Sequence, residues 1–224
     1  MKDKILALFF VVSIGELIAV SADVIQLEWI CKPLLLPILG FYYLKNISNE
    51  YGWSRPVMAA ILFSWLGDVA LILQIINENF FLVGLSCFLI AHVAYILAYR
   101  QHKWPEGDSA LFGIQKFRFA FPIILAGTGL VTILYSHLGD LWVPVMIYSL
   151  VIVVMVLQAL FRYGLTNSPS FWFVLIGALL FMASDSAIAI DKFLAPFELA
   201  RVFVMSTYIA AQLLIVRGLT FHRT

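Results

Sequence analysis

The sequence predicts an all-α, polytopic membrane protein, a bundle of eight transmembrane helices. Of the 224 residues, 63% are hydrophobic and 12% are charged, whereas soluble domains carry roughly 25% charged residues. Eight mostly apolar runs approach the roughly 20 residues that a helix needs to span a bilayer. They cover about residues 4–22, 30–46, 57–76, 80–99, 118–136, 141–161, 171–190 and 198–219. Little chain is left over, so 1–224 is expected to be a single transmembrane helical domain.

The first run imitates a secretory signal peptide. Lys2 and Lys4 precede it, and small residues around Ser21 follow it, as at a cleavage site. However, Glu16 interrupts the apolar run, and the apolar pattern continues to Ala22. We therefore expect this first helix to be retained.

Proline lies near the ends of several of the later runs. Pro near the N-terminal end of a helix loses little hydrogen bonding, and this position is common here: Pro33, Pro56, Pro122 and Pro144. Pro37 lies deeper, so we expect it to bend the second helix near Lys32. The longest connection, 100–117, is polar and contains Pro105.

The basic residues predict the orientation of the bundle. With eight helices, eleven of the 14 Lys and Arg residues fall on one side of the membrane, and Lys32, Lys192 and Arg201 fall on the other. Cytoplasmic loops carry the excess of Lys and Arg. Both termini are therefore expected in the cytoplasm. We expect a multi-pass protein of a bacterial inner (cell) membrane.

Few polar residues interrupt the apolar runs, and two aspartates are the most unusual of them. A charge at the centre of a bilayer costs at least ~2.5–3.5 kcal/mol, so such residues usually face the bundle interior and serve function. Asp68 and Asp185 each lie inside an apolar helix that runs outward. We expect them to share one buried site, in a cleft that opens outward. The in-membrane polar set is Glu16, Lys32, Asp68, His92, Asp185, Tyr208 and Gln212.

Helical spacing groups these residues into polar stripes, which turn inward on an apolar helix. Ser64 precedes Asp68 by four positions, and His92 precedes Tyr95 by three. An ordinary structural role is the alternative for each: an aspartate can simply bond a neighbouring helix. Tyr208 and Gln212 can join helices in the same way, and Glu16 can pair with Lys32.

Several function classes find no support. The net charge is +1, so no nucleic-acid partner is implied. Cys31 and Cys87 lack metal or redox spacing. Of four histidines only His92 lies at membrane depth, which disfavours a catalytic zinc site. No phosphate-binding glycine loop or nucleophile elbow is present. We expect no metal and no cofactor, and the sequence leaves the oligomeric state open.

Two carboxyl groups in one apolar cleft suit acid–base chemistry. They cannot both ionise cheaply, so one stays protonated while the other is charged. Such a pair can protonate an electron-rich centre and add water to an oxocarbenium ion, as in glycoside hydrolysis. Hydrolysis of a vinyl ether follows the same logic, and plasmalogens carry this bond within the membrane.

Five motifs in order together resemble the YhhN-like family of membrane lysoplasmalogenases, from about Ile30 to Gly218. They are Lys32-Pro33, Gly67-Asp68, His92-x-x-Tyr95, Ser184-Asp185 and Tyr208-x-x-Ala211-Gln212-x-Leu214-Ile215. The resemblance implies that Asp68 and Asp185 are the catalytic carboxylates. It also implies a lysophospholipid substrate in the bilayer, lysoplasmenyl-ethanolamine or -choline, cleaved to a fatty aldehyde and a glycerophospho-base. The candidate substrate-binding residues are Lys32, Ser64, His92, Tyr95, Ser184, Tyr208 and Gln212.

Three other interpretations stay open at this point. The aspartates could relay protons in a small-molecule or lipid transporter, which predicts inverted repeats and broken helices. They could lock helices together in a lipid-binding or scaffold protein. The chain could also be a metal-assisted hydrolase, which the histidine count disfavours.

Overall fold

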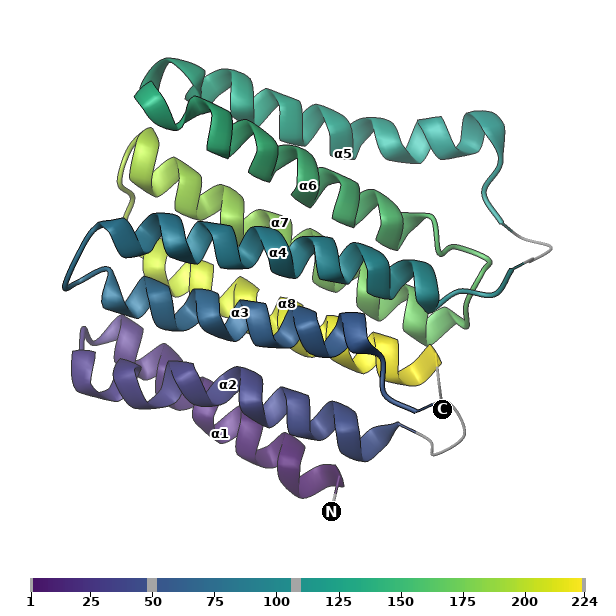
Figure 1. The fold of residues 1–224 in the computed structure, drawn as a ribbon, viewed down its shortest axis with the longest axis horizontal. Helices are drawn as coiled ribbons and strands as arrows, with labels where there is room; N and C mark the ends of the chain where they lie inside the picture. The colour runs from purple at the N-terminus through teal and green to yellow at the C-terminus, as the bar shows by residue number, and fades with distance from the viewer. Residues whose placement is uncertain (1, 48–51, 106–109, 223–224) are drawn as a thin grey trace. The chain divides into compact units, whose positions relative to one another are not determined.

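The computed structural model of the chain describes residues 2–47, 52–105 and 110–222. Within these ranges it contains eight α helices, two short 3₁₀ turns and no strand (Figure 1). Each α helix is long and apolar enough to cross a membrane, so the predicted fold class is confirmed. The helices are α1 (Lys2–Ser21), α2 (Ile25–Asn46), α3 (Arg55–Leu73), α4 (Asn79–Gln101), α5 (Gly113–Leu134), α6 (Trp142–Leu160), α7 (Ser168–Phe193) and α8 (Ala200–His222). The cytoplasmic location of the termini stays a prediction.

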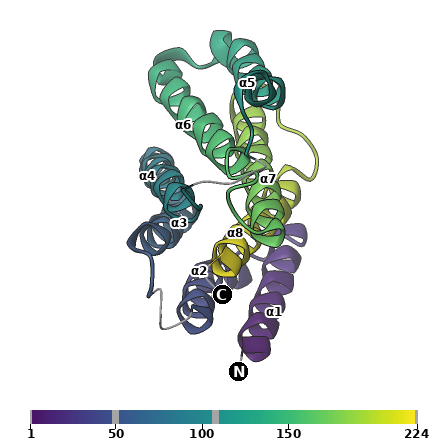
Figure 2. The ribbon, with the colours of Figure 1, turned by 90° about the vertical axis from the view of Figure 1, so that its right-hand side faces the viewer.

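The helices belong to two compact units, and the boundary between the units lies within α4. The first unit ends at Ala98 and the second is Tyr99–His222. In the first unit α1 and α2 form a hairpin, and α2 packs on α3 (Figures 1 and 2). In the second unit α7 and α8 share the largest interface, α5 and α6 form a hairpin, and α6 packs on α7.

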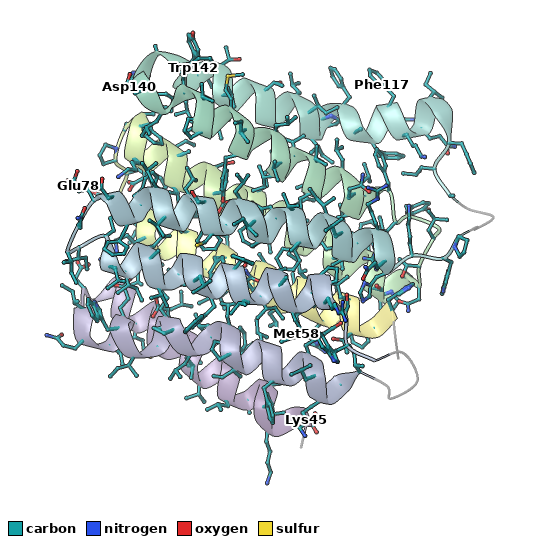
Figure 3. All side chains as sticks on the ribbon, viewed as in Figure 1. Lys45, Met58, Glu78, Phe117, Asp140 and Trp142 are labelled. Atoms are coloured by element: carbon teal, nitrogen blue, oxygen red, sulfur yellow. The ribbon has the colours of Figure 1, made fainter. Side chains whose placement is uncertain are left out.

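Apolar side chains cover the outside of both units, as expected for helices that face lipid. Phe117 of α5 and Trp142 of α6 point outward and are 65% and 46% exposed (Figure 3). In the first unit, Lys45 at the end of α2 and Glu78 between α3 and α4 lie at opposite ends of the helices (Figure 3). Which of these ends faces the cytoplasm stays a prediction from the Lys and Arg residues.

A tryptophan of α3 satisfies the backbone carbonyl group of α2 that a proline leaves without its usual donor. Pro37 has no N–H to donate to the carbonyl oxygen of Pro33, four residues earlier. The indole Nε1 of Trp65, from α3, donates to that oxygen at 2.9 Å. Because the bilayer offers no water, an unpaired carbonyl there costs several kcal/mol. The bond therefore satisfies α2 and joins it to α3.

A buried arginine ties together three segments of the second unit. Arg162, just after α6, is fully buried. Its Nε donates to the His102 carbonyl oxygen at 3.0 Å, and its Nη2 donates to Ser170 Oγ at 2.7 Å. Burial lowers the pKa of Arg162 to about 10, so the side chain stays cationic at neutral pH. Backbone and hydroxyl oxygens thus stabilise a cation that burial alone would disfavour.

Asn167 caps α7 beside this arginine. Its Oδ1 accepts from the backbone N–H of Ser170 at 2.8 Å, which satisfies one of the free N–H groups of the first turn. Its Nδ2 donates to the carbonyl oxygen of Phe221 at 2.7 Å. The start of α7 is thereby held against the end of α8.

Candidate functional site

Asp68 lies in the middle of α3, buried against α4. Gly67, the residue before it, lets the two helices approach: a Cβ there would lie 2.7 Å from the ring of Phe88 in α4. Asp68 is 1% exposed and Ser64, one turn earlier, is 0% exposed. Tyr95 of α4 is buried as well and interacts with both Ser64 and the charge of Asp68. The first unit therefore brings three of the predicted site residues together.

The other predicted residues of the first unit are also buried. His92 lies in α4 one turn before Tyr95 and is 0% exposed. Lys32 is buried in α2, and its Nζ lies 3.8 Å from Glu28 Oε1, one turn earlier on the same helix. Glu16 is buried in α1, near Cys31 of α2.

Asp185 lies in α7 and is held by a tyrosine of α6. The phenol hydroxyl of Tyr148 donates to Asp185 Oδ2 at 2.5 Å. Both side chains are partly buried. The bond is at the short end of the normal range for O–H···O hydrogen bonds, and it holds the carboxyl group of α7 against α6.

A small, partly open pocket of about 40 Å³ lies beside Asp185, lined by residues of α5, α6 and α7. Tyr148, Ser149, Asp185 and Ser186 contribute to its lining, but nearly all of the surface that faces it is apolar. A larger, also mostly apolar groove of about 380 Å³ lies between α2 and α3, around Pro37. The carboxyl group of the second unit thus borders a small, mostly apolar space.

The remaining predicted residues join α7 to α8. Ser184 Oγ donates to the carbonyl oxygen of Val204 at 3.0 Å. The ring of Tyr208 meets the ring of Phe181 edge to face, with centroids 5.5 Å apart. Gln212, one turn after Tyr208, is 1% exposed. These contacts hold the part of α7 that carries Asp185 against α8, while Tyr148 of α6 contacts the carboxyl group itself.

Tyr148 is the residue that sequence reasoning missed. It was one of nine tyrosines, and its helix carries no acidic or basic residue that would single it out. The sequence does contain one sign of this role: Tyr148 and Ser149 place two adjacent hydroxyl groups in the most apolar of the candidate spans. The pattern shows a polar position, but only the packing of α6 on α7 shows which carboxylate it meets.

The arrangement offers carboxyl, hydroxyl and imidazole groups inside apolar helices. Such groups can donate, accept or move a proton where bulk water is scarce. Among the described residues, no cluster of three or more His, Cys, Asp or Glu side chains could hold a metal ion. That the carboxyl groups of Asp68 and Asp185 lie within roughly 10 Å of each other, as in paired-carboxylate hydrolases, stays a prediction.

Known proteins match most of this chain. Human lysoplasmalogenase TMEM86B is 31% identical over 196 residues, covering 85% of this chain and 75% of that protein. Lysoplasmalogenase TMEM86A of Bos taurus is 32% identical over 200 residues, covering 88% and 76%. The lysoplasmalogenase of Mycobacterium tuberculosis is 32% identical over 179 residues, covering 79% and 64%. No solved structure matches the chain.

The relatives and the eight apolar helices agree that this is a multi-pass membrane protein. The family model that matches spans both units and includes every predicted site residue from Lys32 to Gln212. Matched over residues 27–219, the chain belongs to the YhhN family.

Proposed function

We propose that this protein is a membrane-embedded hydrolase that cleaves the vinyl ether bond of lysoplasmalogens. The products are a fatty aldehyde and a glycerophospho-ethanolamine or -choline. Relatives named lysoplasmalogenase, 31–32% identical over most of the chain, support this substrate class. The observation that carries the proposal is that each unit holds one aspartate inside apolar helices with a tyrosine beside it, Asp68 with Tyr95 and Asp185 with Tyr148.

In the proposed mechanism one aspartate is the general acid and the other the general base. The acid gives its proton to the alkene carbon that is not bonded to oxygen, and the double-bond electrons form that C–H bond. The resulting oxocarbenium ion takes up water, whose proton passes to the base. The hemiacetal then collapses to the aldehyde and the alcohol of the glycerol. One water is consumed, and proton exchange with solvent restores both carboxyl groups.

The substrate enters this scheme from the bilayer. Lys32 is proposed to bind the phosphate of the head group, because it is a cation buried within an apolar helix, α2. The proposed location is a bacterial inner (cell) membrane. Lys32→Gln is expected to raise KM for the lysophospholipid with little change in kcat, because the phosphate lies away from the reacting carbon.

The test is turnover of purified protein on lysoplasmenyl-ethanolamine, with detection of the fatty aldehyde. Asp68→Asn and Asp185→Asn keep the side-chain volume, so the fold should survive. Each variant is expected to lose about 10²–10⁴-fold in kcat, because an amide can neither deliver a proton nor activate water. The double variant should lose far less than the product of the two factors, since the groups act as a unit.

Asp140→Asn is the matched control, because this aspartate is exposed in a 3₁₀ turn after α5. It should retain wild-type turnover. If folded Asp68→Asn cleaves the substrate at the wild-type rate, the carboxylate is structural and the catalytic proposal fails. In that case a transporter or a scaffold becomes the better interpretation.

A further inference from the structure

The groove between α2 and α3, in the first unit, has the wall of a site for a hydrocarbon chain. Its volume is about 380 Å³, within the range of ligand pockets in proteins, and nearly all of the surface that faces it is apolar. Its walls include Pro37, Phe41 and Leu44 of α2 and Met58, Leu62 and Trp65 of α3. Because both helices span the membrane and the groove is open on one side, lipid chains can reach it.

Two hydrogen bonds between the helices hold the walls of the groove in register. Near one end, the indole Nε1 of Trp65 donates to the Pro33 carbonyl oxygen at 2.9 Å. Near the other end, the backbone N–H of Ser54 donates to the Tyr43 hydroxyl oxygen at 3.1 Å. The groove extends from one bond to the other, so its shape does not depend on side-chain packing alone.

At the second of these ends, each wall finishes with a basic residue. On α2, Lys45 follows Phe41 by four positions, and its Nζ lies 5.5 Å from the centre of the Phe41 ring. On α3, Arg55 precedes Met58 by three positions. Residues three or four positions apart lie on the same face of a helix. Both cations are exposed, and Figure 3 shows Lys45 and Met58 toward the same end of the two helices.

The cations lie where the head group of a lipid is expected. From Pro37 to Lys45 the rise along α2 is about 12 Å at 1.5 Å per residue, so the apolar wall is long enough for part of a chain. Trp53, two residues before Arg55, is 57% exposed. Exposed tryptophans are enriched at the membrane–water interface, which places this end of the groove at the level of the head groups.

We propose that the groove binds an anionic phospholipid, with one chain along the apolar wall and the head group at Lys45 and Arg55. Lipid tails are as apolar as the side chains of the wall, so the chain alone gives little preference among lipids. The charges give it, because each Lys or Arg near the surface favours an anionic lipid about fivefold. The site uses neither Asp68 nor Asp185, so it is independent of the proposed hydrolysis.

Trp65 reports whether a chain occupies the groove, because bromine on a lipid chain quenches tryptophan fluorescence on contact. The other five of the six tryptophans are replaced by Phe, and the protein is placed in phosphatidylcholine vesicles. Brominated phosphatidylglycerol should half-quench Trp65 at a roughly 10- to 25-fold lower mole fraction than brominated phosphatidylcholine, as two cations predict. Equal mole fractions would overturn the proposal. Fluorescence that neither lipid quenches would also overturn it, since protein would then cover the groove.

Charge variants separate this site from general attraction to the membrane. Lys45→Gln and Arg55→Gln should each lower the preference about fivefold. Lys4→Gln is the matched control, because Lys4 is exposed at the start of α1 and is predicted on the same side of the membrane. It should keep the full preference. Equal losses in the three variants would show a diffuse surface effect only, and the site would be refuted.

Two further measurements complete the test. Glycerol 3-phosphate, a head-group fragment without a chain, should leave the quenching unchanged. Fluorescence restored by this fragment would show that the apolar wall is not part of the site. Native mass spectrometry of the protein with all its tryptophans should retain one phosphatidylglycerol from an equal mixture with phosphatidylcholine. Lys45→Gln with Arg55→Gln should lose it, and retention equal to that of wild type would contradict the proposal.

Discussion

The contact between α7 and α8 depends on two glycines, and one added methyl group should weaken it measurably. A Cβ at Gly177 would lie 2.8 Å from Ile215 Cγ1, 2.9 Å from the Ala211 carbonyl oxygen and 3.0 Å from Ile215 N. A Cβ at Gly218 would lie 2.9 Å from Val174 N. Small residues at such crossings let membrane helices approach closely. The obstacles include backbone atoms, so no side-chain rotation can relieve the overlap.

The expected cost follows from two opposing effects. Overpacking of a close contact costs about 1–3 kcal/mol, whereas Ala in place of Gly stabilises a helix interior by roughly 0.5–1 kcal/mol. We therefore expect Gly177→Ala to lower the free energy of unfolding by about 1–2 kcal/mol. Gly129→Ala is the matched control, because a Cβ at Gly129 of α5 would meet nothing within 4 Å. It should leave stability unchanged or slightly higher.

Both glycines face the same helix pair, so their substitutions should not be independent. A separation of α7 from α8 that accommodates one methyl group also makes room for the other. The loss in Gly177→Ala with Gly218→Ala should be smaller than the sum of the single losses. The assay is equilibrium unfolding in mixed detergent micelles, followed by tryptophan fluorescence. A Gly177→Ala variant as stable as Gly129→Ala, or strictly additive losses, would refute the reasoning.

Further predictions concern the ties that hold each unit. Arg162→Met should lower the free energy of unfolding by about 3 kcal/mol or more, because it leaves several buried oxygen acceptors without a donor. An unfolding midpoint equal to that of wild type would contradict the importance of these hydrogen bonds. Asn167→Ala should cost about 1–2 kcal/mol through the lost cap, measured in the same assay, and no loss would mean that the cap is dispensable. Trp65→Phe should lower the free energy of unfolding by about 1–3 kcal/mol by leaving the Pro33 carbonyl oxygen unpaired, and an unchanged value would contradict this role of the indole. Reporter fusions at Thr224 and within 100–117 should both read cytoplasmic, and an external signal at either would refute the orientation.

The sequence predicts the number and the approximate place of the helices because length and hydropathy decide membrane spans. It misjudges their ends, since a helix can continue past its apolar part. α2 begins at Ile25, five residues before the predicted run, and its added turn carries Glu28, which pairs with Lys32. α5 begins at Gly113, so Lys116 lies in the helix rather than in the connection. The apolar pattern therefore predicts the part of each helix that lies in the lipid, whereas polar residues at the ends can lengthen the helix beyond that part.

The candidate site is predictable as far as spacing along one helix allows. Ser64 and Asp68 follow the four-residue repeat, and the structure adds Tyr95 to them. Tyr148 could not be assigned to Asp185, because which helices neighbour each other is a tertiary property. Arg162 was counted only among the basic residues that set orientation, yet its partners come from both sides of α6 in sequence.

The most direct test of the account is the fate of the proton that the acid delivers. Purified protein is incubated with lysoplasmenyl-ethanolamine in D₂O, and the aldehyde is reduced at once to its alcohol to prevent exchange. The account predicts one deuterium on the carbon next to the former carbonyl, and almost no product from Asp68→Asn or Asp185→Asn. An unlabelled aldehyde, or none from the wild-type protein, would contradict protonation of the vinyl ether by a buried carboxyl group.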